Sequence, residues 1–176
     1  MNHTLNRNPK VLIDWFDDFG KEPNRYAFLS NFYPAEIRYA GDIYPTSEHA
    51  FAAAKVDPAC PEFDEIYEDI AAAPGPGAAK SLGRECPLRP DWETVKFEVM
   101  RAIVWAKFTQ HDDLRTRLLA TGDAYLQEGT YWNDRIWGVD LTVRGVHPLD
   151  RPGQNWLGTI LMETRARLRC ASRMGA

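Results

Sequence analysis

The fold and the candidate site both depend on the segment Tyr44-Pro45-Thr46-Ser47-Glu48-His49-Ala50-Phe51-Ala52-Ala53-Ala54-Lys55. Thr46 follows a proline and is a natural N-cap, so the sequence predicts a helix that begins directly after it. Glu48 then lies in the first turn. Lys55 comes seven residues later, within ~20° of the same helix face and about 10 Å further along the axis.

An acid and an amine on one helix face suggest a pocket for a small polar ligand. Phe51 lies between them on that face, and Tyr44 precedes the helix. A solvated Glu/Lys face on a short surface helix is the commoner arrangement. The helix interior is almost entirely Ala and Phe, however, and this composition favours a buried helix.

Length and composition predict one globular domain. The chain has 176 residues, of which 44% are hydrophobic and 26% charged, so we expect a single domain over residues 1–176 with a flexible segment at 1–10. The net charge of −4 excludes a globally basic surface for nucleic acid, although a local patch is still allowed.

The cysteine and histidine pattern predicts neither a disulfide framework nor a metal site. Cys60, Cys86 and Cys170 are scattered and form no Cys-x-x-Cys pair, and the four histidines have no metal-ligand spacing. The N-terminus lacks a secretory signal pattern, and no apolar run approaches the ~20 residues that span a bilayer. We therefore expect a cytoplasmic protein with no metal, no cofactor and no membrane partner.

The pattern along the chain predicts a mixture of short strands and helices. Residues 11–16 read as a strand, 17–25 as a charged loop and 37–44 as a hairpin that turns at 40–42. Helices are predicted at 62–72, 92–108, 111–120 and 156–169, with Asn155 capping the last of them, and residues 78–84 read as a short helix or a turn. Residues 74–77 and 139–153 read as loops, and 125–128 as a short strand.

A second polar segment, Trp132 to Gly138, places the carboxylate of Asp134 between the indoles of Trp132 and Trp137. Two carboxylates framed by aromatic rings suit cleavage of a glycosidic bond. A loop carboxylate that caps a turn is the favoured alternative for Asp134 from the sequence alone. No phosphate-binding loop, dinucleotide fingerprint or nucleophile elbow is present.

Further motifs occur in a fixed order along the chain. They are Phe28-Leu29-Ser30-Asn31-Phe32, the segment from Tyr44 to Lys55, Leu82-Gly83-Arg84, Leu88-Arg89-Pro90-Asp91-Trp92, Met100-Arg101 with Lys107-Phe108, Trp132-Asn133-Asp134 with Trp137-Gly138, residues 153–158, and Leu161-Met162-Glu163 with Arg165. Together these motifs resemble the NADAR (YbiA-like) family over about residues 26 to 168.

The resemblance implies a mainly helical α+β fold, a single compact domain with a small N-terminal β-hairpin or sheet, and no metal. It also implies an N-glycosidase that hydrolyses N-glycosidic bonds to ribose. The substrates that it suggests are ADP-ribose attached to guanine in nucleic acid and early phosphorylated pyrimidine intermediates of riboflavin synthesis. The implied partners are an ADP-ribose or phosphoribosylamine ligand, ADP-ribosylated DNA and a DarT-like toxin.

The resemblance also implies roles for individual residues. Glu48 would be the catalytic acid/base, and Asp134 would position water or sugar. Lys55 would either attack C1 of a ring-opened sugar and form a Schiff base, or hold a phosphate or a carboxylate. The residues expected to contact substrate are Phe28, Asn31, Tyr44, Phe51, Lys80, Arg84, Arg101, Trp132, Trp137 and Gly138.

Residues 139–153 depart from the family pattern, because this loop is often shorter and richer in glycine in family members. It contains Arg144 and His147, which either contact substrate or only cover the surface. The first function that the resemblance implies is removal of ADP-ribose from guanine in DNA. The alternatives are hydrolysis of riboflavin intermediates and a non-catalytic ADP-ribose-binding module.

Overall fold

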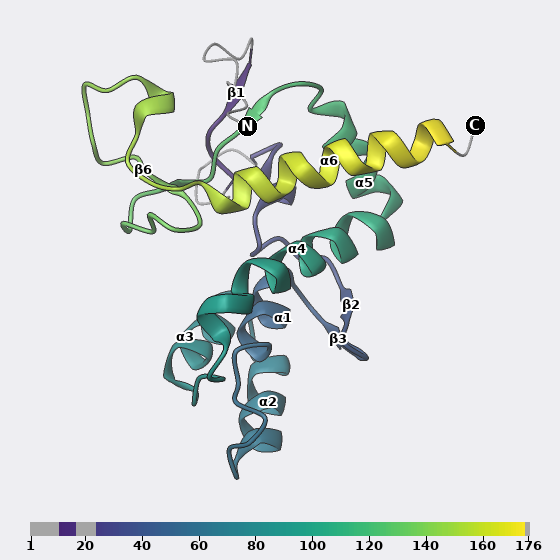
Figure 1. Ribbon diagram of the computed structural model, residues 1–176, viewed down its shortest axis with the longest axis vertical. Helices are drawn as coiled ribbons and strands as arrows, with labels where there is room; N and C mark the ends of the chain where they lie inside the picture. Colours follow the sequence, from purple (N-terminus) through teal and green to yellow (C-terminus); the bar gives the residue numbers. More distant parts are fainter. Residues whose placement is uncertain (1–10, 17–23, 175–176) are drawn as a thin grey trace. The chain divides into compact units, whose positions relative to one another are not determined.

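The computed structural model describes residues 11–16 and 24–174 (Figure 1). The predictions for residues 1–10 and for most of the loop at 17–25 lie outside this part of the chain. The helices are α1 (Ser47–Ala53), α2 (Phe63–Ala71), α3 (Pro76–Glu85), α4 (Trp92–Gln110), α5 (Asp112–Ala120) and α6 (Trp156–Met174), with short 3-10 helices η1 (Ala27–Leu29) and η2 (Pro148–Asp150). The strands are β1 (Leu12–Ile13), β2 (Ile37–Tyr39), β3 (Asp42–Tyr44), β4 (Tyr125–Leu126), β5 (Gly129–Thr130) and β6 (Val139–Asp140).

This arrangement confirms the mainly helical α+β fold. Residues 30–115 form one compact unit, here called the 30–115 unit. The described residues of 1–29 and 116–176 form another, the terminal unit. The single domain over residues 1–176 stays a prediction. None of the helices in the described residues is both long and apolar enough to cross a membrane.

Helix α1 is the centre of the 30–115 unit. It packs against α2, α3, α4 and the hairpin of β2 and β3. In Figure 1, α1, α2 and α3 lie on one side of α4. The seven residues of α1 are too few for a stable isolated helix, so its neighbours supply most of its stability.

The predicted hairpin and the predicted start of α1 are both confirmed. Strands β2 and β3 pair antiparallel, and the turn between them has positive φ at Ala40 (53°) and Gly41 (103°). This is the twist that two-residue hairpin turns require. At the start of α1, Thr46 Oγ1 accepts the N–H of His49 at 3.4 Å, so Thr46 is the N-cap.

The end of α1 differs from the prediction. The helix stops at Ala53, so Lys55 lies beyond it rather than two turns along its face. Residues 55–57 instead run beside 87–89: Arg89 N–H donates to the Lys55 carbonyl at 2.9 Å, and Asp57 N–H donates to the Pro87 carbonyl at 2.8 Å. These non-local backbone bonds replace the bonds that a longer helix would make.

Helix α3 begins earlier than predicted. Pro76 is its first residue, so Pro76 and Gly77 belong to the helix and not to a loop. Proline is tolerated there because the first N–H groups of a helix have no intrahelical acceptor.

The terminal unit contains two parallel two-stranded sheets, and α6 packs against β4. The strand predicted at 11–16 shortens to β1, which pairs with β4. The region 139–153 is not entirely loop, since β6 pairs with β5 and η2 follows. Asn155 directly precedes α6, and its carbonyl accepts the Thr159 N–H at 3.0 Å, while its side chain binds the Glu128 N–H through Oδ1 and the Leu126 carbonyl through Nδ2, both at 2.9 Å. A capping role of Asn155 stays a prediction.

Close packing of α1 on α3 requires a glycine at position 83. A Cβ added to Gly83 would lie 2.8 Å from the Ala52 Cβ, whereas a Cβ at Gly77 of the same helix would meet nothing within 4 Å. We predict that Gly83→Ala lowers the free energy of unfolding by about 1–3 kcal/mol through overpacking. Gly77→Ala should instead be neutral or raise it by up to about 1 kcal/mol. Urea unfolding measures both changes, and equal stability of the two variants would contradict this packing.

Candidate active site

Glu48 lies in the first turn of α1 and is almost completely buried, with 6% of its surface exposed. Its backbone N–H donates to the carbonyl of Asn31 at 3.1 Å. The Thr46 cap precedes it, and His49 follows it and bonds through Nε2 to the Ala73 carbonyl at 3.1 Å. The carboxylate is therefore carried by a backbone that is fixed on both sides.

Lys55 lies just beyond α1 and is partly buried. Its Nζ is 5.2 Å from the centroid of the Phe51 ring and 6.0 Å from that of Trp92, and these two rings are 5.0 Å apart. Burial lowers the pKa of Lys55 below its usual value, while the negative charge of Glu48 acts in the opposite direction. The structure thus brings the predicted acid and amine within electrostatic reach, although by a different backbone path.

Two further cations lie close enough to act on Lys55. The positive charges of Lys80 and Arg84, both on α3, also lower the pKa of Lys55. Lys80 Nζ is 5.5 Å from the centroid of the Phe32 ring, and Arg84 is exposed. Together with Lys55, these two cations form an electropositive setting that suits an anionic ligand. The phosphate contacts of Lys80 and Arg84 stay predictions.

The remaining candidates in the 30–115 unit have other contacts. Asn31 Nδ2 approaches Met100 Sδ at 3.5 Å. Tyr44 has 1% of its surface exposed, and its hydroxyl is hydrogen-bonded to that of Tyr67, so it belongs to the core of the unit. Arg101 pairs with Glu98 at 2.8 Å.

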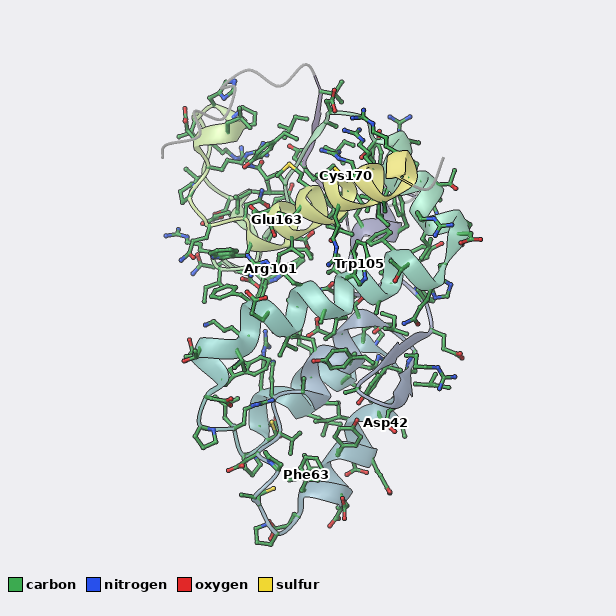
Figure 2. The ribbon with its side chains drawn as sticks, turned by 45° about the vertical axis from the view of Figure 1, so that its right-hand side comes forward. Asp42, Phe63, Arg101, Trp105, Glu163 and Cys170 are labelled. Carbon is green, nitrogen blue, oxygen red and sulfur yellow. The ribbon has the colours of Figure 1, made fainter. Side chains whose placement is uncertain are left out.

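Figure 2 shows Arg101 and Trp105 on the same side of α4, with Trp105 about one helical turn further along the chain. Residues four apart on a helix lie on one face, so Arg101 and Trp105 line the same surface of α4. The contact of Arg101 with substrate stays a prediction.

Asp134 lies in the terminal unit and makes the turn-capping bonds that the sequence favoured. Its Oδ1 accepts the N–H groups of Ile136 at 3.2 Å and Trp137 at 3.0 Å. Nearby, Arg135 binds Asp140 at 2.8 Å. Hydrogen bonds from Thr142 and Arg135 lower the pKa of Asp140 to about 2. These hydrogen bonds stabilise the turn that follows Asp134 and connect Arg135 to β6.

The other predicted residues of the terminal unit differ in exposure. Trp132 has 46% of its surface exposed, and Trp137 is partly buried. Gly138 is buried, and a Cβ there would lie 2.4 Å from the Glu128 carbonyl oxygen. Phe28 is buried under the Arg117 guanidinium, 4.1 Å from the ring centroid. The pairing of these residues and of Asp134 with Glu48 stays a prediction.

Lys107 belongs to one of the motifs that carry the family resemblance, but the sequence interpretation gave it no role. Lys107 lies on α4 and is buried, with 1% of its surface exposed. The signal was present as a lysine inside the apolar run from Ile103 to Phe108. Cys60, Cys86 and Cys170 are free thiols, and within the described residues no group of three or more His, Cys, Asp or Glu could hold a metal ion.

A buried acid near a partly desolvated amine is an arrangement typical of general acid–base or nucleophilic catalysis. The NADAR domain family model matches residues 18–169, so the chain belongs to the NADAR family.

Relatives with established names agree with this membership. The chain is 41% identical to the N-glycosidase YbiA of Escherichia coli strain K12 over 90% of this chain and 91% of that protein. It is 36% identical to an N-glycosidase of Nostoc punctiforme, over 82% and 86% of the two chains. It is also 37% identical to a riboflavin biosynthesis protein of Vibrio vulnificus, over 85% of this chain but 38% of that protein.

The solved structures give the same result. The NMR structure of the E. coli protein YbiA is similar with a TM-score of 0.75 and 35% sequence identity, over 94% of this chain and 89% of that chain. The fold is therefore that of YbiA.

The electrostatics predict two changes in the titration of Lys55. Burial should give Lys55 a pKa below its usual value, so the neutral amine is populated at lower pH than for an exposed lysine. Glu48→Gln removes the charge that favours the ammonium and should lower the pKa of Lys55 further. Titration of the ¹³Cε chemical shift measures both effects. Glu93→Gln, which removes the exposed partner of Lys96 on α4, is the matched control and should leave the Lys55 pKa unchanged. An increase in this pKa in Glu48→Gln would contradict the arrangement.

Proposed function

We propose that the chain is an N-glycosidase that hydrolyses the bond between C1 of a phosphorylated ribose and an exocyclic amine. One observation carries the proposal: buried Glu48 and partly desolvated Lys55 lie within electrostatic reach of each other. The N-glycosidase names of relatives that align along most of their length support the same reaction.

In the proposed mechanism Lys55 is the nucleophile. In the ring-opened ribosylamine, C1 is bonded to the nitrogen of the base as an imine. The neutral Nζ of Lys55 adds to C1, Glu48 gives a proton to the departing amine, and the bond from C1 to that amine breaks. Water then adds to the Lys55 imine with Glu48 as base, which releases the ribose and restores the free lysine.

The surroundings of the pair fit these roles. Phe51 and Trp92 lie near the Lys55 amine, and its burial favours the neutral form that attacks. Lys80 and Arg84 supply charge for the phosphates of the substrate. Asp134, Trp132 and Trp137 belong to the terminal unit, and their proposed roles as positioner of water or sugar and as stacking surfaces stay predictions from the sequence.

The first substrate that we propose is ADP-ribose attached to guanine in DNA. The diphosphate of ADP-ribose matches a site with more than one cation. The reaction would reverse modification by a DarT-like toxin, and it would place the protein in the cytoplasm as an antitoxin or DNA repair enzyme.

The second candidate substrate is an early phosphorylated pyrimidine intermediate of riboflavin synthesis. A specific observation favours it: relatives from Vibrio vulnificus and Zea mays are named riboflavin biosynthesis proteins. Both substrates present a phosphorylated ribosylamine, so the same residues would act on either.

Turnover of the two substrates tests the proposal. We predict that the wild type releases ADP-ribose from ADP-ribosylated guanine DNA and that Glu48→Gln lowers kcat by at least about 100-fold, since it removes the proton donor. Glu93→Gln, an exposed acid of α4, should keep wild-type kcat. Turnover of the pyrimidine intermediate alone would select the second substrate. Tight binding of ADP-ribose without turnover of either substrate would instead identify a binding module.

A further inference from the structure

Lys107 is a lysine in the core of the 30–115 unit. Its ammonium donates to the carbonyl of Ser30 at 2.8 Å and lies 5.5 Å from the ring centroids of both Tyr33 and Phe108. Removing an ammonium from water is costly, and an apolar side chain of the same length would avoid the cost. A lysine at this position therefore requires an explanation beyond packing.

The carbonyl that Lys107 binds belongs to a tight turn. Tyr33 N–H also donates to the Ser30 carbonyl, at 3.3 Å, and Phe32 N–H donates to Ser30 Oγ at 3.1 Å. Ser30 therefore accepts two hydrogen bonds within the turn at residues 30–33. Its carbonyl oxygen, which closes the turn, is also bound by the Lys107 ammonium. A charged donor gives a stronger hydrogen bond than a neutral one.

The same turn holds the backbone of Glu48. Asn31, next to Ser30, accepts the N–H of Glu48 at 3.1 Å, and its side chain approaches Met100 Sδ on α4. A continuous path therefore runs from the Lys107 ammonium through the Ser30–Asn31 backbone to the first turn of α1. Each link in this path is a contact between neighbouring groups.

We propose that Lys107 is a positioning residue for Glu48. It clamps the turn at residues 30–33 so that the Asn31 carbonyl holds the Glu48 backbone, and it does so without touching the substrate. The inference rests on the proposed function, because positioning matters for catalysis only if Glu48 is the acid/base. A small displacement of a catalytic group is sufficient to cost much of its rate.

Amide hydrogen exchange tests the clamp without any substrate. Lys107→Met keeps the length of the side chain but removes the donor. It should speed exchange at the Glu48 amide by at least about tenfold relative to the Ala54 amide, which bonds to Ala50 within the same helix segment. Lys107→Gln, which retains an N–H donor and no charge, should give a smaller increase and covers the case in which the Met variant does not fold.

Arg165→Met is the matched control. Arg165 is also a buried cation bonded to the backbone, through Nη2 to the Ala124 carbonyl at 2.9 Å, but it belongs to the terminal unit. Its removal should lower stability without a selective change at the Glu48 amide. Equal exchange at Glu48 and Ala54 in Lys107→Met would overturn the clamp.

Steady-state kinetics then test whether the clamp serves catalysis. Lys107→Met should lower kcat by at least about tenfold with KM within about twofold of wild type, as expected for a displaced catalytic group. Arg165→Met should keep wild-type kcat below its melting temperature. Selective exchange at Glu48 with unchanged kcat would overturn the positioning role. An inactive wild type would contradict the proposed function alone. The hydrogen-exchange experiment needs no substrate, so it still tests whether Lys107 stabilises the Glu48 amide.

Discussion

The structure of the 30–115 unit depends on the burial of the first turn of α1. A helix of seven residues is not stable in isolation, so neighbouring residues must stabilise its first turn. Thr46 caps the helix, the His49 side chain bonds to the carbonyl of Ala73 just after α2, and the Asn31 carbonyl accepts the Glu48 N–H. At Gly83 the absence of a side chain lets α3 approach α1 closely. The position of the buried carboxylate follows from these constraints.

The early end of α1 sets the environment of the amine. Because residues 55–57 leave the helix to bond with 87–89, Lys55 lies against Phe51 and Trp92, near the end of α3. Burial and the neighbouring cations favour the neutral amine, whereas Glu48 favours the ammonium. Burial has the largest effect, so the pKa of Lys55 is lower than its usual value. The same site therefore holds a buried acid, a partly buried amine and two further cations, and the proposed mechanism relies on this combination.

Structural features that depend on neighbouring residues could be predicted from the sequence, whereas pairing between distant residues could not. The Thr46 cap, the hairpin at 37–44 and most helices followed from residue types over a few positions. Strands β5 and β6 are too short to show an alternating pattern in the sequence. The end of α1 depends on bonds between residues 55–57 and 87–89, which are far apart along the chain. The contacts of Asn155 with Leu126 and Glu128 have the same origin.

The candidate site follows this division too. Glu48 and Lys55 were identified from spacing and family resemblance, but the buried role of Lys107 was visible only in three dimensions.

The most direct test of the account is reductive trapping with cyanoborohydride during turnover, followed by peptide mass spectrometry. The account predicts a ribose-derived adduct on Lys55, absent from Lys55→Ala and absent without substrate. The reduced amine cannot be hydrolysed, so the adduct should accumulate with loss of activity. Undiminished turnover with no adduct on Lys55 would contradict the central claim that Glu48 and Lys55 act together as proton donor and nucleophile.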